Sequence, residues 1–448
     1  FAFLAQASGP SQGQSQSRFS SLVRSPSAMA TEPPAKKAKI EELEGKTYEL
    51  YGQYNVPKVE DSVNFKVGQP SPALLPLQKM AEAATLKWKQ NNPLFLQYGW
   101  ISGYKEFRES LAGFLAKNYE EPVDPATLFT TNGISGALHL LVSVFAQKGD
   151  TVFTETPSYF LALSIFKDAN LNIVPIDMDE DGMIVDQVEA KLKEGVKPKF
   201  IYTVPVFSNP SAKTLSADRR AKLASLAAEY DFMVFADEVY HMLGFPGAEK
   251  PPKPLVYYDK ADKILSLGSF AKICAPALRL GWFQASSPDS KILKTLFERG
   301  LLDSSGGLNP LNAGIIEMMI ELGTLQENME STKKALGDRS QVLVDAIEKA
   351  GLKDLGCKFQ VPRGGYFIWL TLPEGVDSRE LLALGLEKYK VSFLPGAAAG
   401  PKFTNAIRLS FSYYSAEDVG VGANRVAELI KAYGNGERAG GGVGKKMW

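Results

Sequence analysis

Between residues 128 and 272 the sequence alternates between short apolar runs and segments of helical periodicity, and this alternation restricts the fold more than any other feature. Residues 232–236 are almost entirely apolar, as in a parallel strand that helices cover on both faces. In residues 223–230 the apolar positions recur at i, i+3, i+4 and i+7, which gives one apolar helical face. The pattern predicts a mostly parallel α/β sheet, with ligands at the carboxyl ends of its strands.

Polar side chains follow the predicted strands at the points where the strands end. Because the carboxyl ends of parallel strands share one edge of a sheet, we expect these side chains to lie close together. The candidates at or just beyond strand ends are Tyr159, Asn209, Asp237, Tyr240 and Lys272.

Lys272 follows the mostly apolar run of residues 264–270. Burial disfavours the charged ammonium and lowers the pKa of a lysine. A neutral amine at this position can attack a carbonyl and form an imine. Because most lysines at strand ends simply reach solvent, the functional interpretation depends on the neighbouring candidates and not on Lys272 alone.

A glycine-rich turn at residues 132–136 follows a predicted strand at 128–131 and precedes a predicted helix at 137–147. Such a turn brings free backbone N–H groups to a positive helix end, which suits a phosphate, although many α/β proteins have such turns without a ligand. The loop of residues 97–103 combines aromatic residues with glycines. This pattern is typical of internal packing, and also of contact with a flat ligand or a partner subunit.

The composition argues against several classes of function. Among 448 residues, 50 basic and 50 acidic side chains cancel, so no global field attracts nucleic acid or an anionic membrane. No apolar run reaches the roughly 18 residues of a membrane-spanning helix. Two cysteines and two histidines are too few for a disulfide framework or a zinc site, and we expect no metal. The composition favours a small-molecule enzyme or binding protein in a reducing compartment.

Several motifs occur together in one order along the chain. Residues 269–272 read Ser-Phe-Ala-Lys, and residues 279–282 read Arg-Leu-Gly-Trp. Asp237 and Tyr240 form an Asp-x-x-Tyr pair, and Asn209 begins an Asn-Pro-Ser-Ala sequence. Together these motifs resemble the fold-type I pyridoxal-phosphate (PLP) enzymes, specifically the class I/II aminotransferases, over roughly residues 64–432. The resemblance implies a large domain with a mostly parallel central sheet flanked by helices, and a smaller α+β domain.

The resemblance also implies roles for the residues around the PLP ring. Lys272 would form the internal aldimine with PLP, and Asp237 would hold the protonated ring nitrogen so that the ring accepts electrons. Tyr240 and Asn209 would lie beside the ring oxygen. Tyr159 would stack on the ring.

The phosphate of PLP would be held at the glycine-rich turn. The resemblance assigns it to the backbone and side chains of Gly133, Ile134 and Ser135, to Ser269, and to the planar fork of Arg279. Ile134 replaces a residue that often contributes a hydroxyl, which leaves more of this task to backbone amides. Two further departures, Ser-Ala for Thr-Gly after Asn-Pro and Ala271 for a serine, preserve the chemical groups.

The substrate would be held by Arg408, which matches the arginine that binds the α-carboxylate bidentately, and by Asn209 and the loop at Gly68. Tyr98 matches a tyrosine that reaches across a homodimer interface to the phosphate. The resemblance thus implies a homodimer whose active sites are shared between subunits.

The predicted function is a transaminase that moves the amino group of an L-amino acid to a 2-oxo acid. The stretches at residues 67–72 and 305–310 resemble the 2-aminoadipate, aromatic and kynurenine transaminase branch. A carbon–sulfur β-lyase or related synthase on the same scaffold is the alternative. A non-catalytic regulator with an aminotransferase-like domain is less favoured, because the first 47 residues offer no winged helix.

We predict five segments along the chain. They are a transit-peptide-like or disordered segment at 1–47, an N-terminal arm with part of the small domain at 48–85, the large PLP-binding domain at 86–309, the C-terminal small domain at 310–433, and a flexible tail at 434–448.

The first 31 residues contain no Asp or Glu, are rich in serine, and carry Arg18 and Arg24, a composition typical of organelle transit peptides. This composition predicts a chloroplast or mitochondrial location. A flexible tail ahead of a translation start at Met29 would instead place the protein in the cytoplasm.

Overall fold

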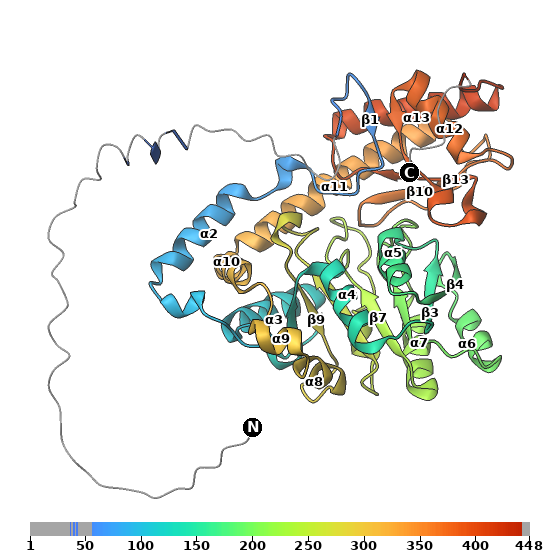
Figure 1. Ribbon diagram of the computed structural model, residues 1–448. Coiled ribbons are helices and arrows are strands. Elements are labelled where there is room, and N and C mark those ends of the chain that lie inside the picture. The colour runs from blue at the N-terminus through green and yellow to red at the C-terminus, as the bar shows by residue number, and fades with distance from the viewer. Residues whose placement is uncertain (1–35, 37–38, 41, 44–55, 441–448) are drawn as a thin grey trace, which may run out of the picture. The chain divides into compact units, whose positions relative to one another are not determined.

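The computed structural model describes residues 36, 39–40, 42–43 and 56–440 (Figure 1). The predicted transit-peptide-like segment therefore falls almost entirely outside the described residues, as do residues 441–448 of the predicted tail. Residues 56–440 lie in one compact unit. Within the described residues, no helix is long and apolar enough to cross a membrane, and no group of three or more His, Cys, Asp or Glu side chains is arranged to hold a metal.

An eight-stranded sheet forms the centre of this unit, in the order β2-β9-β8-β7-β6-β3-β4-β5. The pairs between β4, β3, β6, β7 and β8 are all parallel, whereas β9 runs antiparallel to β8 and β2, and β5 antiparallel to β4. The strands are β2 (Leu128–Thr131), β3 (Thr151–Thr156), β4 (Asn172–Asp179), β5 (Gly182–Met183), β6 (Phe200–Thr203), β7 (Met233–Asp237), β8 (Ile264–Ser269) and β9 (Gly281–Gln284).

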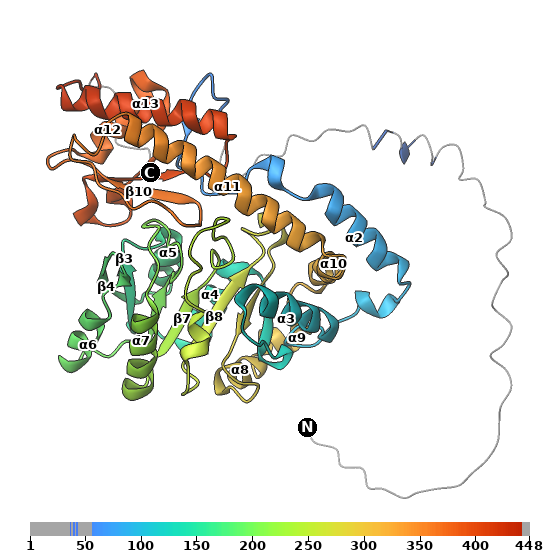
Figure 2. The same ribbon diagram turned by 180° about the vertical axis from the view of Figure 1, so that it is seen from behind.

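Helices bury both faces of the sheet, which is why the central strands β6 and β7 are almost continuously apolar. Successive residues of β6 show this, because Phe200 and Tyr202 join one hydrophobic cluster and Ile201 joins the other. The first cluster includes residues of α4 (Gly133–Phe145) and α5 (Phe160–Asp168), and the second those of α6 (Val185–Lys193) and α7 (Ala217–Tyr230). Figures 1 and 2 show the two sides of this arrangement.

A smaller group of elements gathers beyond one end of the sheet (Figures 1 and 2). A three-stranded antiparallel sheet has the order β10-β13-β12, and β1 from the N-terminal side pairs in parallel with β11. The elements of this group are β1 (Val63–Asn64), α11 (Thr324–Lys349), β10 (Phe367–Thr371), α12 (Ser378–Leu384), β11 (Val391–Ser392), β12 (Leu394–Pro395), β13 (Ala406–Ser410) and α13 (Ala416–Gly434).

The remaining helices lie at the side of the large sheet. α10 packs against α2 and α3. Their bounds are α2 (Leu77–Lys89), α3 (Lys105–Tyr119), α8 (Lys291–Phe297), α9 (Gly300–Ser305) and α10 (Pro310–Glu321). After α13, residues 435–440 return to the small group of elements, where the Glu437 carboxylate accepts hydrogen bonds from Lys388 at 2.9 Å and Tyr389 at 2.8 Å.

The structure corrects one local expectation, the extent of the turn at residues 132–136. The predicted turn at 132–136 is already helical from Gly133, whose φ of +71° lets the chain enter α4 directly. Further along the chain, α10 and α11 are separate helices, because Gly323, the N-cap of α11, has a φ of +74° that breaks the helical path. Ser216 occupies the N-cap of α7, but its side chain makes no capping hydrogen bond.

Arg220 of α7 is fully buried and anchors the segment that leaves β6. Its guanidinium donates to the carbonyls of Pro205 at 2.7 Å, Leu215 at 2.9 Å and Lys253 at 3.1 Å, and it lies 3.9 Å from the Glu238 carboxylate. Burial lowers the pKa of Arg220, and Glu238 opposes that shift. One buried cation thus holds both ends of residues 205–215.

We expect Arg220→Leu to lower the free energy of unfolding by about 3–5 kcal/mol, because it leaves buried carbonyls and the Glu238 carboxylate without their cation. Arg219→Leu is the control, since Arg219 lies on the same helix and pairs with the partly exposed Asp179. Its expected cost is about 1 kcal/mol or less. Urea unfolding followed by tryptophan fluorescence measures both, and equal losses for the two variants would contradict the account.

Candidate active site

Lys272 lies three residues beyond β8, at the carboxyl edge of the large sheet. Its Nζ donates to the Gly68 carbonyl at 2.5 Å and lies 5.1 Å from the ring centroid of Tyr366 and 6.0 Å from that of Tyr240. Burial lowers the pKa of Lys272 to about 8, with the Arg408 cation acting in the same direction and Asp237 opposing it. The amine is therefore easier to deprotonate than an ordinary lysine.

Asp237 is the last residue of β7 and is buried. Tyr202 Oη donates to its Oδ2 at 2.9 Å, and the Val239 N–H donates to its Oδ1 at 3.4 Å. Burial raises the pKa of Asp237 to about 7, and the Tyr202 hydrogen bond offsets part of that rise. A buried carboxylate with a raised pKa is stabilised in its ionised form by a cationic N–H donor.

The N-terminus of α4 and Arg279 together form a place for an anion. A Cβ built on Gly133 would lie 3.2 Å from Arg279 Nη2, so the guanidinium lies beside the first turn of the helix. The first N–H groups of a helix have no intrahelical partner, and the helix dipole favours negative charge there. Ser135 is exposed in this turn, Ile134 packs against the core, and Ser269 is buried at the end of β8.

Arg408 projects from β13 toward the large sheet and is buried. Its Nη1 donates to Asn209 Oδ1 at 2.7 Å, and its Nη2 donates to the Lys66 carbonyl at 2.5 Å. The guanidinium carbon lies 4.2 Å from the ring centroid of Phe367. Gly68 fits tightly here, because a Cβ on it would lie 2.9 Å from the Phe367 ring.

Among the predicted aromatic residues, the structure brings two toward the site and leaves one apart. Tyr240 is buried against the rings of Tyr366 and Phe367, and burial raises its pKa well above the usual value. Tyr159 is close enough to act electrostatically on Tyr240. Tyr98 is 82% exposed, and within the described residues it makes no hydrogen bond or ring contact with the other predicted site residues.

Sequence reasoning missed several residues that contact the site. Tyr202 bonds Asp237, Tyr366 lies over Lys272 and donates to its carbonyl at 3.1 Å, and Phe367 supports Arg408. In the sequence these three look like ordinary core aromatics of strands. A signal existed for Tyr366 and Phe367, which follow a Gly-Gly pair, but not for Tyr202, whose role depends on the pairing of β6 with β7.

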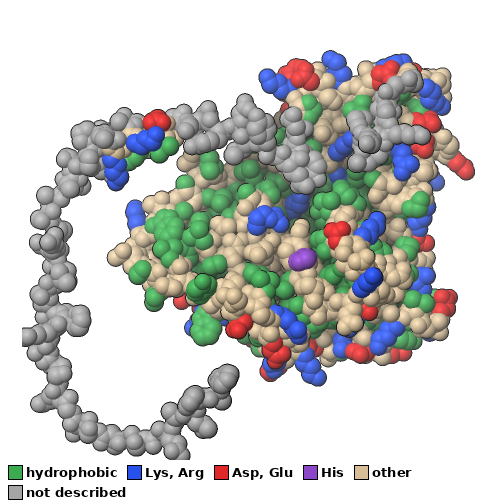
Figure 3. All heavy atoms as spheres, in the orientation of Figure 1, with side chains coloured by type: hydrophobic (Ala, Val, Ile, Leu, Met, Phe, Trp, Pro, Cys, Tyr) green, Lys and Arg blue, Asp and Glu red, His purple; other side chains and the backbone are tan. Residues whose placement is uncertain are grey.

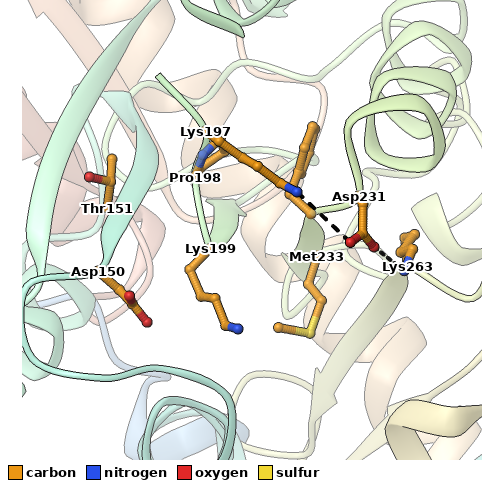
Figure 4. Close-up of a pocket in the computed structure, with 9 residues that line it drawn as sticks. Asp150, Thr151, Lys197, Pro198, Lys199, Asp231, Met233 and Lys263 are labelled. Atoms are coloured by element: carbon orange, nitrogen blue, oxygen red, sulfur yellow. Dashed lines mark hydrogen bonds and ion pairs between the residues drawn. The ribbon is translucent and has the colours of Figure 1, made fainter. Parts of the chain in front are cut away.

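A surface pocket of about 380 Å³ lies at the opposite edge of the sheet, where β3, β6, β7 and β8 begin. Figure 4 shows Lys197 and Lys263 both reaching Asp231, at 3.8 Å and 2.7 Å. None of the predicted site residues lines this pocket. Its charged side chains form solvated ion pairs, and the pocket is separate from the site around Lys272.

Comparison with known proteins identifies the family. Residues 60–426 match the model of aminotransferase class I and II, and the chain belongs to that family. An aromatic-amino-acid aminotransferase of Thermococcus litoralis is 32% identical over 392 residues, which cover 86% of this chain and 92% of that protein.

Solved structures of two further relatives have the same fold. A Pyrococcus horikoshii kynurenine aminotransferase, solved with its substrates and products, has a TM-score of 0.75 and 30% identity, covering 92% of this chain and 97% of that one. An α-aminoadipate aminotransferase of Thermus thermophilus has a TM-score of 0.72 and 27% identity, covering 84% of this chain and 93% of that one. The fold class, the transaminase activity and the cofactor PLP predicted from the sequence are confirmed. The roles of individual residues stay predictions.

The residues present fit PLP on structural grounds. Arg279 and the α4 N-terminus suit a phosphate, the Asp237 carboxylate suits a ring N–H, and Lys272 offers an amine of lowered pKa. When bound, PLP supplies an electron sink for the bonding electrons of a substrate α-carbon. The protein's part is to hold the ring and the substrate and to move protons.

We expect the amine of Lys272 to react with a small carbonyl reagent in proportion to its neutral fraction. In protein stripped of PLP, reductive methylation of Lys272 should rise with pH with a midpoint near 8. An ordinary lysine has a pKa of about 10.4 and should be labelled only at higher pH. Peptide mass spectrometry follows Lys272 and exposed lysines such as Lys199 in one digest. A Lys272 curve that coincides with those of the exposed lysines would contradict this assignment.

Proposed function

We propose that this transaminase takes the amino group of an aromatic, kynurenine-like or 2-aminoadipate-like L-amino acid and gives it to a 2-oxo acid. The observation that carries the proposal is the loop at residues 66–68. Its Gly68 carbonyl accepts from Lys272, and its Lys66 carbonyl accepts from Arg408. The same three-residue loop therefore bridges a proton-transfer amine and a carboxylate-binding guanidinium.

Each residue then has a defined task. Arg408 binds the α-carboxylate of the substrate through its planar fork, and this contact orients the α-carbon. Lys272 Nζ, once neutral, takes the proton from that carbon and returns it during product formation. Asp237 would pair with the protonated ring nitrogen, whose charge would favour the ionised carboxylate, and Tyr202 donates a hydrogen bond to that carboxylate. Arg279, Ser269 and the α4 N-terminus would hold the phosphate.

The substrate class rests on the relatives and on the aromatic lining of the site. Tyr240, Tyr366 and Phe367 gather around Lys272 and Arg408. Aromatic rings offer offset and edge-on contacts to a flat substrate side chain. The relatives named above carry aromatic, kynurenine and α-aminoadipate names. No feature of the site favours the carbon–sulfur β-lyase alternative.

We expect the purified protein loaded with PLP to be yellow and to lose its visible band when an accepted amino acid is added without a 2-oxo acid. The screen should include phenylalanine, tyrosine, kynurenine, 2-aminoadipate and, as a control, a cysteine conjugate. Lys272→Ala should retain PLP and lose turnover, because it removes the proton-transfer amine. Pyruvate and ammonia released from the cysteine conjugate would favour the β-lyase, and a protein that gains no visible absorbance with PLP would overturn the assignment.

A second copy of this chain is the partner we propose for an apolar surface. α10 packs on α2 and η2 (Pro93–Leu96), so these elements form one continuous region. Figure 3 shows hydrophobic side chains gathered on the side that carries α2. Large exposed apolar patches mark interaction sites. The exposed hydrophobic residues on these elements and the chain segments next to them are Leu75, Leu77, Leu86, Trp88, Leu94, Leu96, Tyr98, Trp100 and Leu311.

We expect a homodimer at micromolar concentration, in which Tyr98 of one copy completes the phosphate site of the other. The double substitution Leu96→Ser with Trp100→Ser should shift the protein toward monomer and weaken PLP retention, since it removes apolar contact area. Leu355→Ser is the control, because Leu355 is 46% exposed outside this region. Light scattering after gel filtration gives the mass. A wild-type monomer, or a double variant that remains fully dimeric, would contradict the proposal.

A further inference from the structure

Glu155 is a buried carboxylate in β3 to which the site described above gives no role. Its Oε2 accepts from Thr203 Oγ1 at 2.8 Å, and its Oε1 accepts from Ser208 Oγ at 2.8 Å and from the Val204 N–H at 3.1 Å. All three donors belong to β6 and to the segment that follows it. Glu155 thus ties one strand to the segment that leaves its neighbour.

The Glu155 carboxylate accepts hydrogen bonds at the point where the backbone pairing of β3 with β6 ends. The pairing of β3 with β6 ends at Thr154 and Tyr202, one residue before Glu155 and Thr203. Beyond that point β3 and β6 separate, although β3 stays paired with β4. The Val204 N–H donates to the Glu155 side chain where a paired strand would offer a carbonyl. An unpaired buried N–H is costly, so this side chain lets residues 204–208 diverge from β3 while staying bonded.

Ser208 connects the Glu155 carboxylate to the site around Arg408. The next residue, Asn209, accepts from Arg408 Nη1 through its Oδ1 at 2.7 Å. Ser208 is also held in a closed turn, because its N–H donates to the Lys213 carbonyl at 2.9 Å and its carbonyl accepts from the Ala212 N–H at 2.7 Å. Arg220 bonds the carbonyls of Pro205 and Leu215, so residues 205–215 are also held at both ends.

The energetic cost of Glu155 indicates that the position needs this carboxylate. Burial raises the pKa of Glu155 to about 7, and the hydrogen bonds from Thr203, Ser208 and Val204 offset part of that rise. An apolar side chain in a buried strand avoids the desolvation cost altogether. It cannot, however, accept three hydrogen bonds from two adjacent segments.

We propose that Glu155 is a positioning residue that acts through Ser208 to fix the Asn209 amide against Arg408, and so sets the affinity for the α-carboxylate of the substrate. The inference rests on the proposed role of Arg408. The hydrogen bonds of Glu155 go to Thr203, Val204 and Ser208, so it acts on the substrate only through these residues. Its effect should therefore appear in the binding of carboxylates, and not in the binding of neutral analogues.

The test uses the PLP-loaded protein and two non-reacting acids, 3-phenylpropanoate and hexanedioate, each paired with its neutral amide. Calorimetry gives the dissociation constants, independently of turnover. We expect Ser208→Ala to weaken the tighter acid about tenfold and to leave its amide within twofold of wild type. Glu155→Gln should weaken the acid in the same direction, and the double variant should add little, because both changes interrupt one path.

Thr203→Val is the matched control, since it removes a hydrogen bond to the same carboxylate without touching the link to Ser208. It should leave the acid within twofold of wild type. Three results would each overturn the inference. They are a Ser208→Ala variant that binds the acid as wild type does, equal weakening of acid and amide, and a Thr203→Val variant with the same effect as Ser208→Ala. A wild-type protein that binds neither acid more tightly than its amide would instead overturn the role of Arg408, and this inference with it. Because Ser208→Ala removes only one hydroxyl, we expect this variant to fold, and it tests the inference even if Glu155→Gln does not fold.

Discussion

The structure depends on keeping a lysine amine and an arginine guanidinium close together inside a largely buried site. Lys272 and Arg408 repel each other when both are charged, and the repulsion adds to the effect of burial in lowering the pKa of Lys272. The loop at residues 66–68 makes the pair possible by offering one backbone carbonyl to each. A neutral amine beside a permanent cation is what proton transfer at the α-carbon of a carboxylate-bearing substrate requires.

Buried acids at the carboxyl ends of β7 and β3, the two strands that flank β6, hold the other parts of this edge. Asp237 ends β7 with Tyr202 as its donor, and Glu155 near the end of β3 binds the segment after β6. Next to Asp237, Glu238 accepts from the Leu255 N–H at 2.6 Å and lies near Arg220. Because each acid bonds a neighbouring strand or loop, loss of one member should disturb the edge locally rather than the whole sheet.

The sequence was sufficient for features that depend on local pattern. The apolar strands that end in Asp237 and lead to Lys272 follow from periodicity, and the motifs assign the family. Features that depend on pairing between strands were not predictable. Tyr202 looks like a core aromatic until its position next to β7 is known, and Glu155 reads as one charge in a strand until Ser208 folds back onto it. The helix start at Gly133 depends on a positive φ that the sequence permits but does not require.

The central claim is that Lys272 is the amine that bonds PLP. Borohydride reduction of the PLP-loaded protein fixes such a bond, and peptide mass spectrometry then locates it. We predict one modified peptide, with the added mass on Lys272. An adduct on any other lysine, or a reduced protein with no adduct, would contradict it.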